Sequence, residues 1–178
     1  MLVKVIAAVN NKGYIWKDNA LMWTNKYEMA FFKKTTLNHT VVMWRKTFQS
    51  IWHPLPQRNN VIITRTTSWM HDATWELLYD LHDVTAVDSL KKSLQMLIVW
   101  ALWSHPPHTV FIIGGGTLYQ EAVSWGFADE IILSIVDNDD EGDVSFPPIN
   151  PEMYQIYKTD YSNKIYWFYN VYYKRVWQ

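Results

Sequence analysis

The chain of 178 residues lacks cysteine altogether and is poor in glycine, of which it has 6. Without cysteine there is no disulfide, no thiolate nucleophile and no thiolate metal ligand, which fits a reducing cytoplasm. Average glycine usage is about 7% of residues, so glycine is under-used here, whereas tryptophan is over-used with 11 residues. The shortage of one residue and the excess of the other are complementary.

Neither sign of charge predominates, since 16 Lys and Arg stand against 17 Asp and Glu and give a formal net charge of -1. The basic residues are scattered rather than gathered into a stripe, so nucleic acid is not expected as a partner. The 6 histidines show no ligand-like pair on one helix face. A metal hydrolase is therefore disfavoured, and no metal site is predicted.

Long hydrophobic runs are also missing. The N-terminal apolar run, residues 3–9, is too short for a signal core or a membrane span and is interpreted as a first, central strand. Hydrophobic residues make up 49% of the chain, enough to bury the core of one compact domain. We expect a single domain over residues 1–178, without a dividing linker or membrane association, as a cytoplasmic monomer.

Strand-like and helix-like patterns alternate along the chain, which predicts an α/β fold with a long loop after the first strand. Strands are expected at residues 3–9, 40–43, 60–64, 84–87, 109–113 and 130–136, and helices at 27–36, 46–51, 88–103 and 118–125. Two last strands, near 155–161 and 165–176, have no helix between them. They are expected to form an antiparallel edge hairpin around a turn at 162–164.

Gly114, Gly115 and Gly116 follow an apolar strand and precede an amphipathic segment. Because glycine has no Cβ, its backbone N–H groups can approach a pyrophosphate closely, and the following helix N-terminus adds positive potential. Glycines of this kind more often serve a tight turn. The strand-turn-helix context favours a nucleotide-phosphate site.

Motifs along nearly the whole chain resemble those of dihydrofolate reductases. No single motif is decisive, but their order and spacing agree throughout. The matching segments are Ile6-Ala7-Ala8-Val9, Gly13-Tyr14-Ile15, Lys17-Asp18-Asn19-Ala20-Leu21, Trp23, residues 31–37, Val41-Val42-Met43, Arg45-Lys46-Thr47-Phe48, Ser50-Ile51, Pro54-Leu55-Pro56, residues 58–62, Gly114-Gly115-Gly116, Glu141-Gly142-Asp143 and Phe146-Pro147.

The resemblance implies a single-domain, three-layer α/β fold with a central, mostly parallel sheet, a C-terminal antiparallel hairpin and flanking helices. It also implies the reduction of 7,8-dihydrofolate to 5,6,7,8-tetrahydrofolate for one-carbon metabolism, with a hydride from NADPH to C6 and a proton to N5. The cofactor carries the hydride, while the protein positions and polarises the reactants. Dihydrofolate and antifolates are the implied small-molecule ligands.

Glu28 is the acid of interest, because Met29, Ala30, Phe31 and Phe32 follow it. On a helix it shares a face with Phe31 and Phe32. A carboxylate facing an apolar pocket has a raised pKa and can bind two parallel N–H donors of a pterin. The alternative is an ordinary first-turn acid that complements the helix dipole. The resemblance favours the catalytic interpretation, with N5 protonation assisted through water.

The resemblance also implies a substrate site. Arg58 matches the clamp for the glutamate α-carboxylate, a role suited to the planar guanidinium fork. Ser134 stands where the family usually has Thr, within reach of the carboxylate. The other implied substrate positions are Ile6, Ala7, Met29, Phe32, Lys33, Ile51, Leu55, Ile113 and Tyr119, and the implied catalytic group is Glu28, Trp23, Leu21 and Ser134.

The implied cofactor is NADPH rather than NADH, because cationic side chains lie at a predicted helix start where a 2′-phosphate can bind. A charge pair such as Arg45-Lys46 is usually just solvated surface, so this inference depends on position. The implied cofactor positions are Ala8, Ile15, Asn19, Ala20, Arg45, Lys46, Thr47, Thr64, Arg65, Gly114, Gly115, Gly116, Thr117 and Leu118.

Trp16, Trp44 and Trp52 stand where the family pattern has glycine, and Met22 stands where it has proline. Trp44 adjoins the expected pyrophosphate, and it is strained if the position requires a positive φ. Glycine and tryptophan codons can differ by one base, and some genetic codes reassign UGA. One hypothesis is therefore that several of these tryptophans are misread glycines.

Two other functions stay open. A reductase of the same fold acting on a pyrimidine of riboflavin synthesis keeps the cofactor half but lacks the pair Glu28 and Arg58, so that pair argues against it. A catalytically impaired folate-binding protein has a cofactor site obstructed by Trp16 and Trp44. Separate affinities for folate and NADPH distinguish this second alternative from the reductase.

Overall fold

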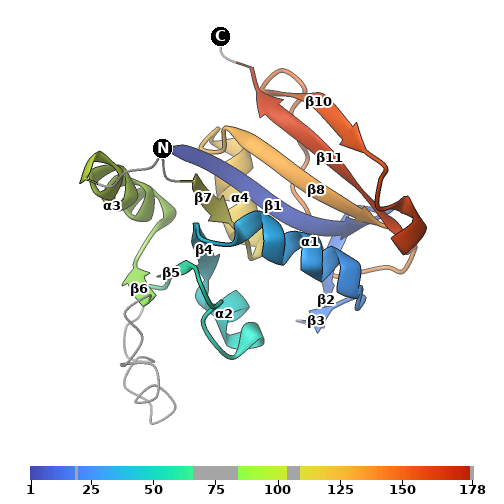
Figure 1. Ribbon diagram of the computed structural model, residues 1–178, viewed down its shortest axis with the longest axis horizontal. Helices are drawn as coiled ribbons and strands as arrows, with labels where there is room; N and C mark the ends of the chain where they lie inside the picture. Colours follow the sequence, from blue (N-terminus) through green and yellow to red (C-terminus); the bar gives the residue numbers. More distant parts are fainter. Residues whose placement is uncertain (19, 66–83, 104–108, 177–178) are drawn as a thin grey trace.

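The computed structural model describes residues 1–18, 20–65, 84–103 and 109–176, except for the side chains of Leu21 and Trp103. Within these residues an eight-stranded sheet has the order β10-β11-β8-β1-β7-β4-β5-β6 (Figure 1). Its strands are β1 (Leu2–Asn10), β4 (Thr40–Trp44), β5 (Asn59–Ile63), β6 (Val84–Val87), β7 (Thr109–Ile112), β8 (Glu130–Val136), β10 (Tyr154–Asp160) and β11 (Phe168–Arg175). Neighbours from β8 to β6 are parallel, whereas β11 is antiparallel to β8 and β10. The predicted sheet and its C-terminal hairpin are confirmed.

Helices cover both faces of this sheet. α1 (Lys26–Thr36) and α2 (Arg45–Ile51) pack on one face, and α3 (Leu90–Trp103) and α4 (Gly116–Ser124) pack on the other. Side chains alternate along β1, so Val5 joins the core under α3 and α4, while Ile6 joins the core under α1 and α2. Figure 1 shows α1 in front of β1 and α4 behind it. The three-layer α/β prediction is confirmed.

The ends of the central parallel strands meet at one edge of the sheet. The N–H of Trp44, at the end of β4, donates to the carbonyl of Gly114 at 2.7 Å, just beyond β7. Gly114 has φ +128°, which an L side chain rarely adopts, so glycine is required at this junction. Ligands of open α/β sheets bind at such carboxyl ends.

A small second sheet lies where the sequence predicted a long loop. It has the order β3-β2-β9, formed by β2 (Tyr14–Lys17), β3 (Ala20–Leu21) and β9 (Val144–Ser145). The loop prediction is wrong for these residues. Strands of two to four residues are too short to show a periodic pattern, and β9 pairs with β2 from a distant part of the chain.

The last strand also begins later than predicted. Residues 164–166 form a single 3-10 turn, η2 (Lys164–Tyr166), and β11 starts at Phe168. Trp167 closes this turn in the left-handed conformation, with φ 67°. The apolar side chains of Ile165 and Tyr166 resembled a strand, but Ile165 is exposed and belongs to the turn.

The tryptophans at the expected glycine positions differ in backbone conformation. Trp52 ends α2 with φ 68°, the left-handed conformation that favours glycine at a helix C-terminus. Trp44 has φ -73°, which every residue adopts readily. The condition for strain at Trp44, a positive φ, is therefore not met, whereas Trp52 does have a positive φ.

Candidate active site

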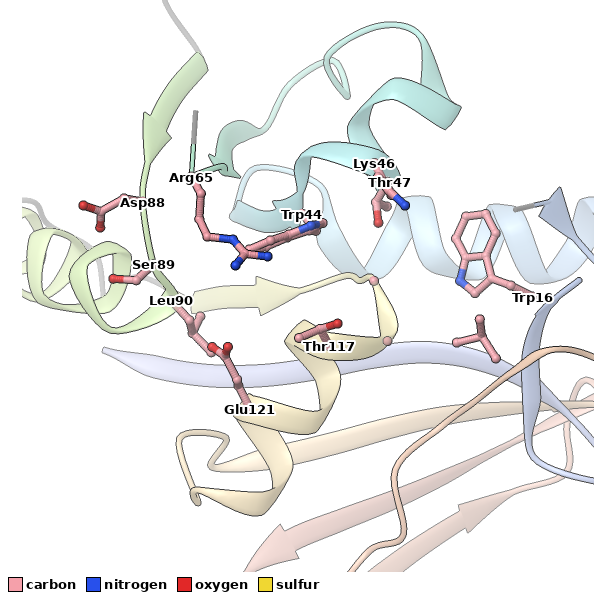
Figure 2. Close-up of a pocket in the computed structure, with 13 residues that line it drawn as sticks. Trp16, Trp44, Lys46, Thr47, Arg65, Asp88, Ser89, Leu90, Thr117 and Glu121 are labelled. Carbon is pink, nitrogen blue, oxygen red and sulfur yellow. The ribbon is translucent and has the colours of Figure 1, made fainter. Parts of the chain in front are cut away.

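A pocket of about 630 Å³ opens at the carboxyl ends of the parallel strands (Figure 2). β4, β6 and β7 end around it, and α2 and α4 begin there. Its lining residues are Trp16, Trp44, Lys46, Thr47, Arg65, Asp88, Ser89, Leu90, Gly115, Gly116, Thr117, Glu121 and Val144. The pocket thus brings together several residues that the sequence predicted as cofactor-binding: Lys46, Thr47, Arg65, Gly115, Gly116 and Thr117.

Gly115 and Gly116 line this pocket with backbone alone, and neighbouring side chains lie close to where a Cβ would stand. A Cβ at Gly116 would approach Val144 Cγ1 to 2.9 Å, and a Cβ at Gly115 would approach Thr47 Oγ1 to 3.4 Å. Gly115 is the N-cap of α4, and no side chain caps this helix start. The N–H of Leu118 donates to the Gly115 carbonyl at 2.9 Å, so the first-turn N–H groups that can serve an anion at the pocket surface are those of Gly116 and Thr117, where the helix dipole also favours negative charge.

Cations lie at the opposite wall. Figure 2 shows the Arg65 guanidinium reaching toward the Trp44 indole, and its carbon lies 5.9 Å from the ring centroid. Lys46 contributes a second, exposed cation. Trp16 and Trp44, the two rings that the alternative of an obstructed cofactor site invokes, both belong to the lining of this pocket of about 630 Å³.

Other predicted cofactor residues lie around rather than in this pocket. Thr64 is buried beside a smaller adjoining pocket that Arg65 also lines. Ile15 and Leu118 belong to the core, and Ala20 is exposed on β3. Arg45 and Ala8 are half-buried, and Gly114 forms the junction described above. Asn19 lies outside the described residues.

Besides Trp16 and Trp44, five lining residues were not predicted as site residues: Asp88, Ser89, Leu90, Glu121 and Val144. Asp88 and Ser89 follow β6 directly, and ligands of parallel sheets bind at the carboxyl ends of the strands, so their position could have been predicted. The sequence analysis interpreted them only as the cap of the following helix. Glu121 lies one turn after Thr117 on α4, on the same helix face. Val144 belongs to the unpredicted strand β9, so its position had no sequence signal.

Glu28 lies in the first turn of α1, where Asn25 is the N-cap. The Asn25 Oδ1 accepts from the N–H of Tyr27 at 3.0 Å and of Glu28 at 3.1 Å. Its Nδ2 donates to the Tyr166 carbonyl at 2.7 Å, and the Tyr27 and Tyr166 rings stack at 3.9 Å. The start of α1 is thus fixed to η2, a contact that the sequence did not reveal.

Burial raises the pKa of Glu28 to about 7, and a hydrogen bond with Ser134 lowers it in part. Ser134 lies on β8, and its Oγ donates to Asn170 Oδ1 at 2.9 Å. Tyr119 donates its hydroxyl to the Ile6 carbonyl at 3.0 Å, and burial together with the charge of Glu28 raises the pKa of this phenol. A carboxyl group that titrates near neutral pH can hold or release a proton there.

An apolar cluster forms between the sheet and the two helices on the Glu28 side. It contains these predicted substrate residues: Ile6, Phe32, Ile51, Leu55 and Ile113. Ala7 points to the core on the other face of β1. Met29 is 55% exposed and Lys33 is exposed, while Trp23 is half-buried. The Leu21 side chain lies outside the description.

Arg58 is 4% exposed, and burial lowers the pKa of its guanidinium. Its Nε is buried without a hydrogen-bond partner. An unsatisfied donor on a buried cation is costly, so this group calls for an anionic acceptor. Its position precedes β5, after the Pro54-Leu55-Pro56 segment, as the sequence predicted.

No set of three His, Asp or Glu side chains within the described ranges is arranged to hold a metal ion. None of the described helices combines the length and apolar character that crossing a bilayer requires.

The fold and the site define an α/β protein with a pocket lined by glycines and cations at its strand ends, and with an acid, Glu28, whose pKa burial raises to about 7. The chain belongs to the dihydrofolate reductase family, since the family model "Dihydrofolate reductase" matches residues 2–175. The Glu28, Arg58 and triple-glycine motifs that suggested the resemblance lie within this span.

Individual relatives agree with this assignment. Dihydrofolate reductase type 3 of Salmonella typhimurium is 35% identical over 147 residues, covering 83% of this chain and 79% of the relative. Dihydrofolate reductase of Bacillus subtilis (strain 168) is 29% identical over 163 residues, covering 92% and 86%. The fold is similar to that of Enterococcus faecalis dihydrofolate reductase complexed with NADP(H) and RAB-propyl, with a TM-score of 0.75, 23% identity and coverage of 98% and 96%.

Proposed function

We propose that this protein catalyses the NADPH-dependent reduction of 7,8-dihydrofolate to 5,6,7,8-tetrahydrofolate. The C=N bond between C6 and N5 becomes CH–NH, C6 takes a hydride, N5 takes a proton, and NADPH becomes NADP⁺. The observation that carries the proposal is Glu28, a carboxyl group with a pKa of about 7 in a family member, beside an apolar cluster that contains Ile6 and Phe32.

Glu28 performs two tasks in this proposal. Its carboxylate accepts two parallel hydrogen bonds from the N–H edge of the pterin, which fixes the orientation of the ring. Because its pKa lies near neutrality, it also holds a proton under working conditions and supports protonation of N5 through water. Ser134 orients the carboxyl group from β8, and the half-buried Trp23 and Leu21 on β3 complete the proposed catalytic group.

The apolar cluster and Arg58 account for the rest of the substrate. Ile6, Phe32, Ile51, Leu55 and Ile113 provide the wall for the pterin and benzoyl rings, with Ala7, Met29, Lys33 and Tyr119 as the other proposed substrate positions. The orphan Nε of Arg58 fits the α-carboxylate of the glutamate tail, since a buried guanidinium gains most from a charged, bidentate partner.

The residues around the large pocket fit a phosphorylated dinucleotide. The glycine lining and the uncapped start of α4 suit a pyrophosphate, and Arg65 and Lys46 suit a 2′-phosphate. When bound, NADPH supplies the hydride. Thr47, Thr64, Arg45 and Thr117 are proposed to position its phosphates, and Ala8, Ile15, Ala20 and Asn19 its nicotinamide end. We also propose that the protein is located in the cytoplasm and is a monomer.

Separate binding measurements distinguish this function from a folate-binding protein with an obstructed cofactor site. Tryptophan fluorescence titrations with NADPH and with folate should give saturable binding of both, because the pocket stays open beside Trp16 and Trp44. Binding of folate without NADPH would support the impaired protein. Dihydrofolate-dependent oxidation of NADPH, measured with the same preparation, should accompany binding of both ligands.

A further inference from the structure

Ser134 and Asn170 form a buried pair beneath Glu28. They are direct partners across the antiparallel strands β8 and β11, and both are 0% exposed. The Ser134 Oγ lies 2.9 Å from Asn170 Oδ1. The Ser134 side chain also acts on Glu28 as a hydrogen-bonding neighbour that lowers the pKa of its carboxyl group. The Asn170 Nδ2 is buried with no partner. Three polar side chains thus form a row in which one donor group is unused.

The hydroxyl of Ser134 has only one hydrogen to share between its two neighbours. An ionised Glu28 can only accept, so the hydrogen must then point to the carboxylate. The remaining 2.9 Å contact would join two acceptor oxygens, Ser134 Oγ and Asn170 Oδ1, without a hydrogen between them. Turning the amide by half a rotation replaces Oδ1 with Nδ2, which has nearly the same shape and can donate.

We propose that Asn170 is a positioning residue for Glu28, and that its side-chain amide reverses with the charge of that carboxyl group. With Glu28 ionised, Nδ2 donates to Ser134 Oγ, and the hydroxyl donates to the carboxylate. With Glu28 protonated, the acid donates to Ser134 Oγ, which donates to Asn170 Oδ1. The two arrangements differ by the one proton of the Glu28 carboxyl group, which exchanges with solvent; Ser134 and Asn170 keep their hydrogens and change only the direction of their hydrogen bonds.

This proposal rests on the proposed role of Glu28 as the proton-holding acid. Reversal keeps a donor facing the buried carboxylate, which is where an unmatched polar group costs most. It also explains why a strand position facing the interior has an amide instead of an apolar side chain. Among the described residues, Tyr119 of α4 is a titratable group whose pKa is raised by burial and by the charge of Glu28, whereas β8 and β11 contribute the neutral Ser134 and Asn170.

The direct test is NMR of protein labelled with ¹⁵N-asparagine, titrated from about pH 5 to pH 9, a range that brackets the pKa expected of Glu28. The Asn170 side-chain NH₂ signals, assigned by their loss in Asn170→Leu, should shift with the same midpoint as the ¹³Cδ signal of Glu28. The shift should vanish in Glu28→Gln and in Ser134→Ala. Asn60 is the internal control, because its buried Nδ2 donates to the carbonyls of Leu55 and Arg58.

An Asn170 signal that stays still while the Glu28 carbon titrates would overturn the proposal. So would a shift that persists unchanged in Ser134→Ala, since the amide would then sense the charge through space. These readings do not depend on activity. If the Asn170 signal shifts with pH but Glu28→Gln is fully active, the reversal of the amide is supported and the proposed catalytic role of Glu28 fails. If Glu28→Gln is inactive and the Asn170 signal does not shift with pH, the catalytic role of Glu28 is supported and the reversal of the amide fails.

Kinetics supply a second test. Asn170→Leu removes the donor behind Ser134, which weakens the hydroxyl as a partner for ionised Glu28. The midpoint of the kcat–pH profile should then move upward by about half a pH unit. In a Ser134→Ala background the same substitution should leave the midpoint unchanged. Equal shifts in both backgrounds would show a structural effect of Asn170 that does not pass through Ser134.

Discussion

The guanidinium of Arg65 lies over the indole ring of Trp44, with its carbon 5.9 Å from the ring centroid. A cation held over an aromatic face is stabilised by about 0.5–1 kcal/mol at an exposed site. Trp44 therefore restrains the arginine at the pocket edge instead of closing the pocket. Trp44, which stands where the family pattern has glycine, thus has a role that substitutions can test.

Arg65→Ala should raise the KM for NADPH about tenfold, or about 1.4 kcal/mol, because a phosphate loses a charged partner. The KM for NADH should hardly change, since NADH has no 2′-phosphate. Steady-state kinetics with both cofactors measure the difference. Lys174→Ala is the matched control, because Lys174 is an exposed cation on β11, a strand that contributes no residue to the pocket lining. Equal losses with NADPH and NADH would contradict a 2′-phosphate role.

Glu28→Gln should reduce turnover of dihydrofolate by about 10²–10⁴-fold at neutral pH, the range typical of a lost general acid or base. The loss should grow as pH rises toward the Glu28 pKa of about 7, because protonation of N5 is then limiting, and should level off above it, because the wild-type carboxyl group is then ionised as well. Single-turnover absorbance measurements at several pH values follow the reaction. A variant that folds normally and retains the wild-type rate would remove Glu28 from the mechanism.

The same substitution should stabilise the folded protein at alkaline pH. Burial raises the pKa of Glu28 from 4.5 in the unfolded reference to about 7 in the folded state. The folded state thus binds the proton more tightly, and wild-type stability falls as pH rises between these values. Glu28→Gln should gain about 1–3 kcal/mol in urea unfolding at pH 8 and little at pH 4. A gain that is independent of pH would contradict burial of the charge as its cause.

Trp52→Gly should stabilise the protein by about 1 kcal/mol, because glycine relieves the left-handed conformation at φ 68°. The Trp52 ring is 84% exposed, so little packing is lost with it. Trp125→Gly is the matched control: this residue also ends a helix and is exposed, but its φ of -95° suits any residue. There glycine should lower stability by about 0.5 kcal/mol through chain entropy.

The conformation of Trp52 also bears on the misreading hypothesis. Trp167 shares it, with φ 67° at the end of η2, whereas Trp44 does not. Peptide mass spectrometry of protein from its natural source should reveal glycine first at positions 52 and 167 if codons are misread. Tryptophan at both positions would exclude misreading there.

Much of the fold followed from the sequence because its central elements are long and strongly patterned. β1 and β8 are buried β-branched runs, and their neighbours alternate with helices, so order and type were predictable. The elements that were missed owe their structure to distant partners. β2 exists because β9 pairs with it, and η2 ends at Trp167 because of a backbone conformation that tryptophan rarely adopts.

The site divides in the same way. The chemistry of Glu28, Arg58 and the glycines was predictable from their local sequence, and in the structure Arg58 is buried and Glu28 is half-buried. The contacts that position them do not show in sequence. Asn170 meets Ser134 only through sheet register, and Asn25 reaches Tyr166 only after the chain has folded back. Short-range patterns therefore identified reactive groups but missed their supports.

The most direct measurement is the decay of NADPH absorbance with dihydrofolate, using protein of the printed sequence from about pH 5 to pH 9. The account predicts dihydrofolate-dependent oxidation whose rate falls with rising pH around a midpoint near the Glu28 pKa of about 7. No oxidation at any pH, with NADPH still bound, would contradict the central claim. So would a rate that is indifferent to pH across this range.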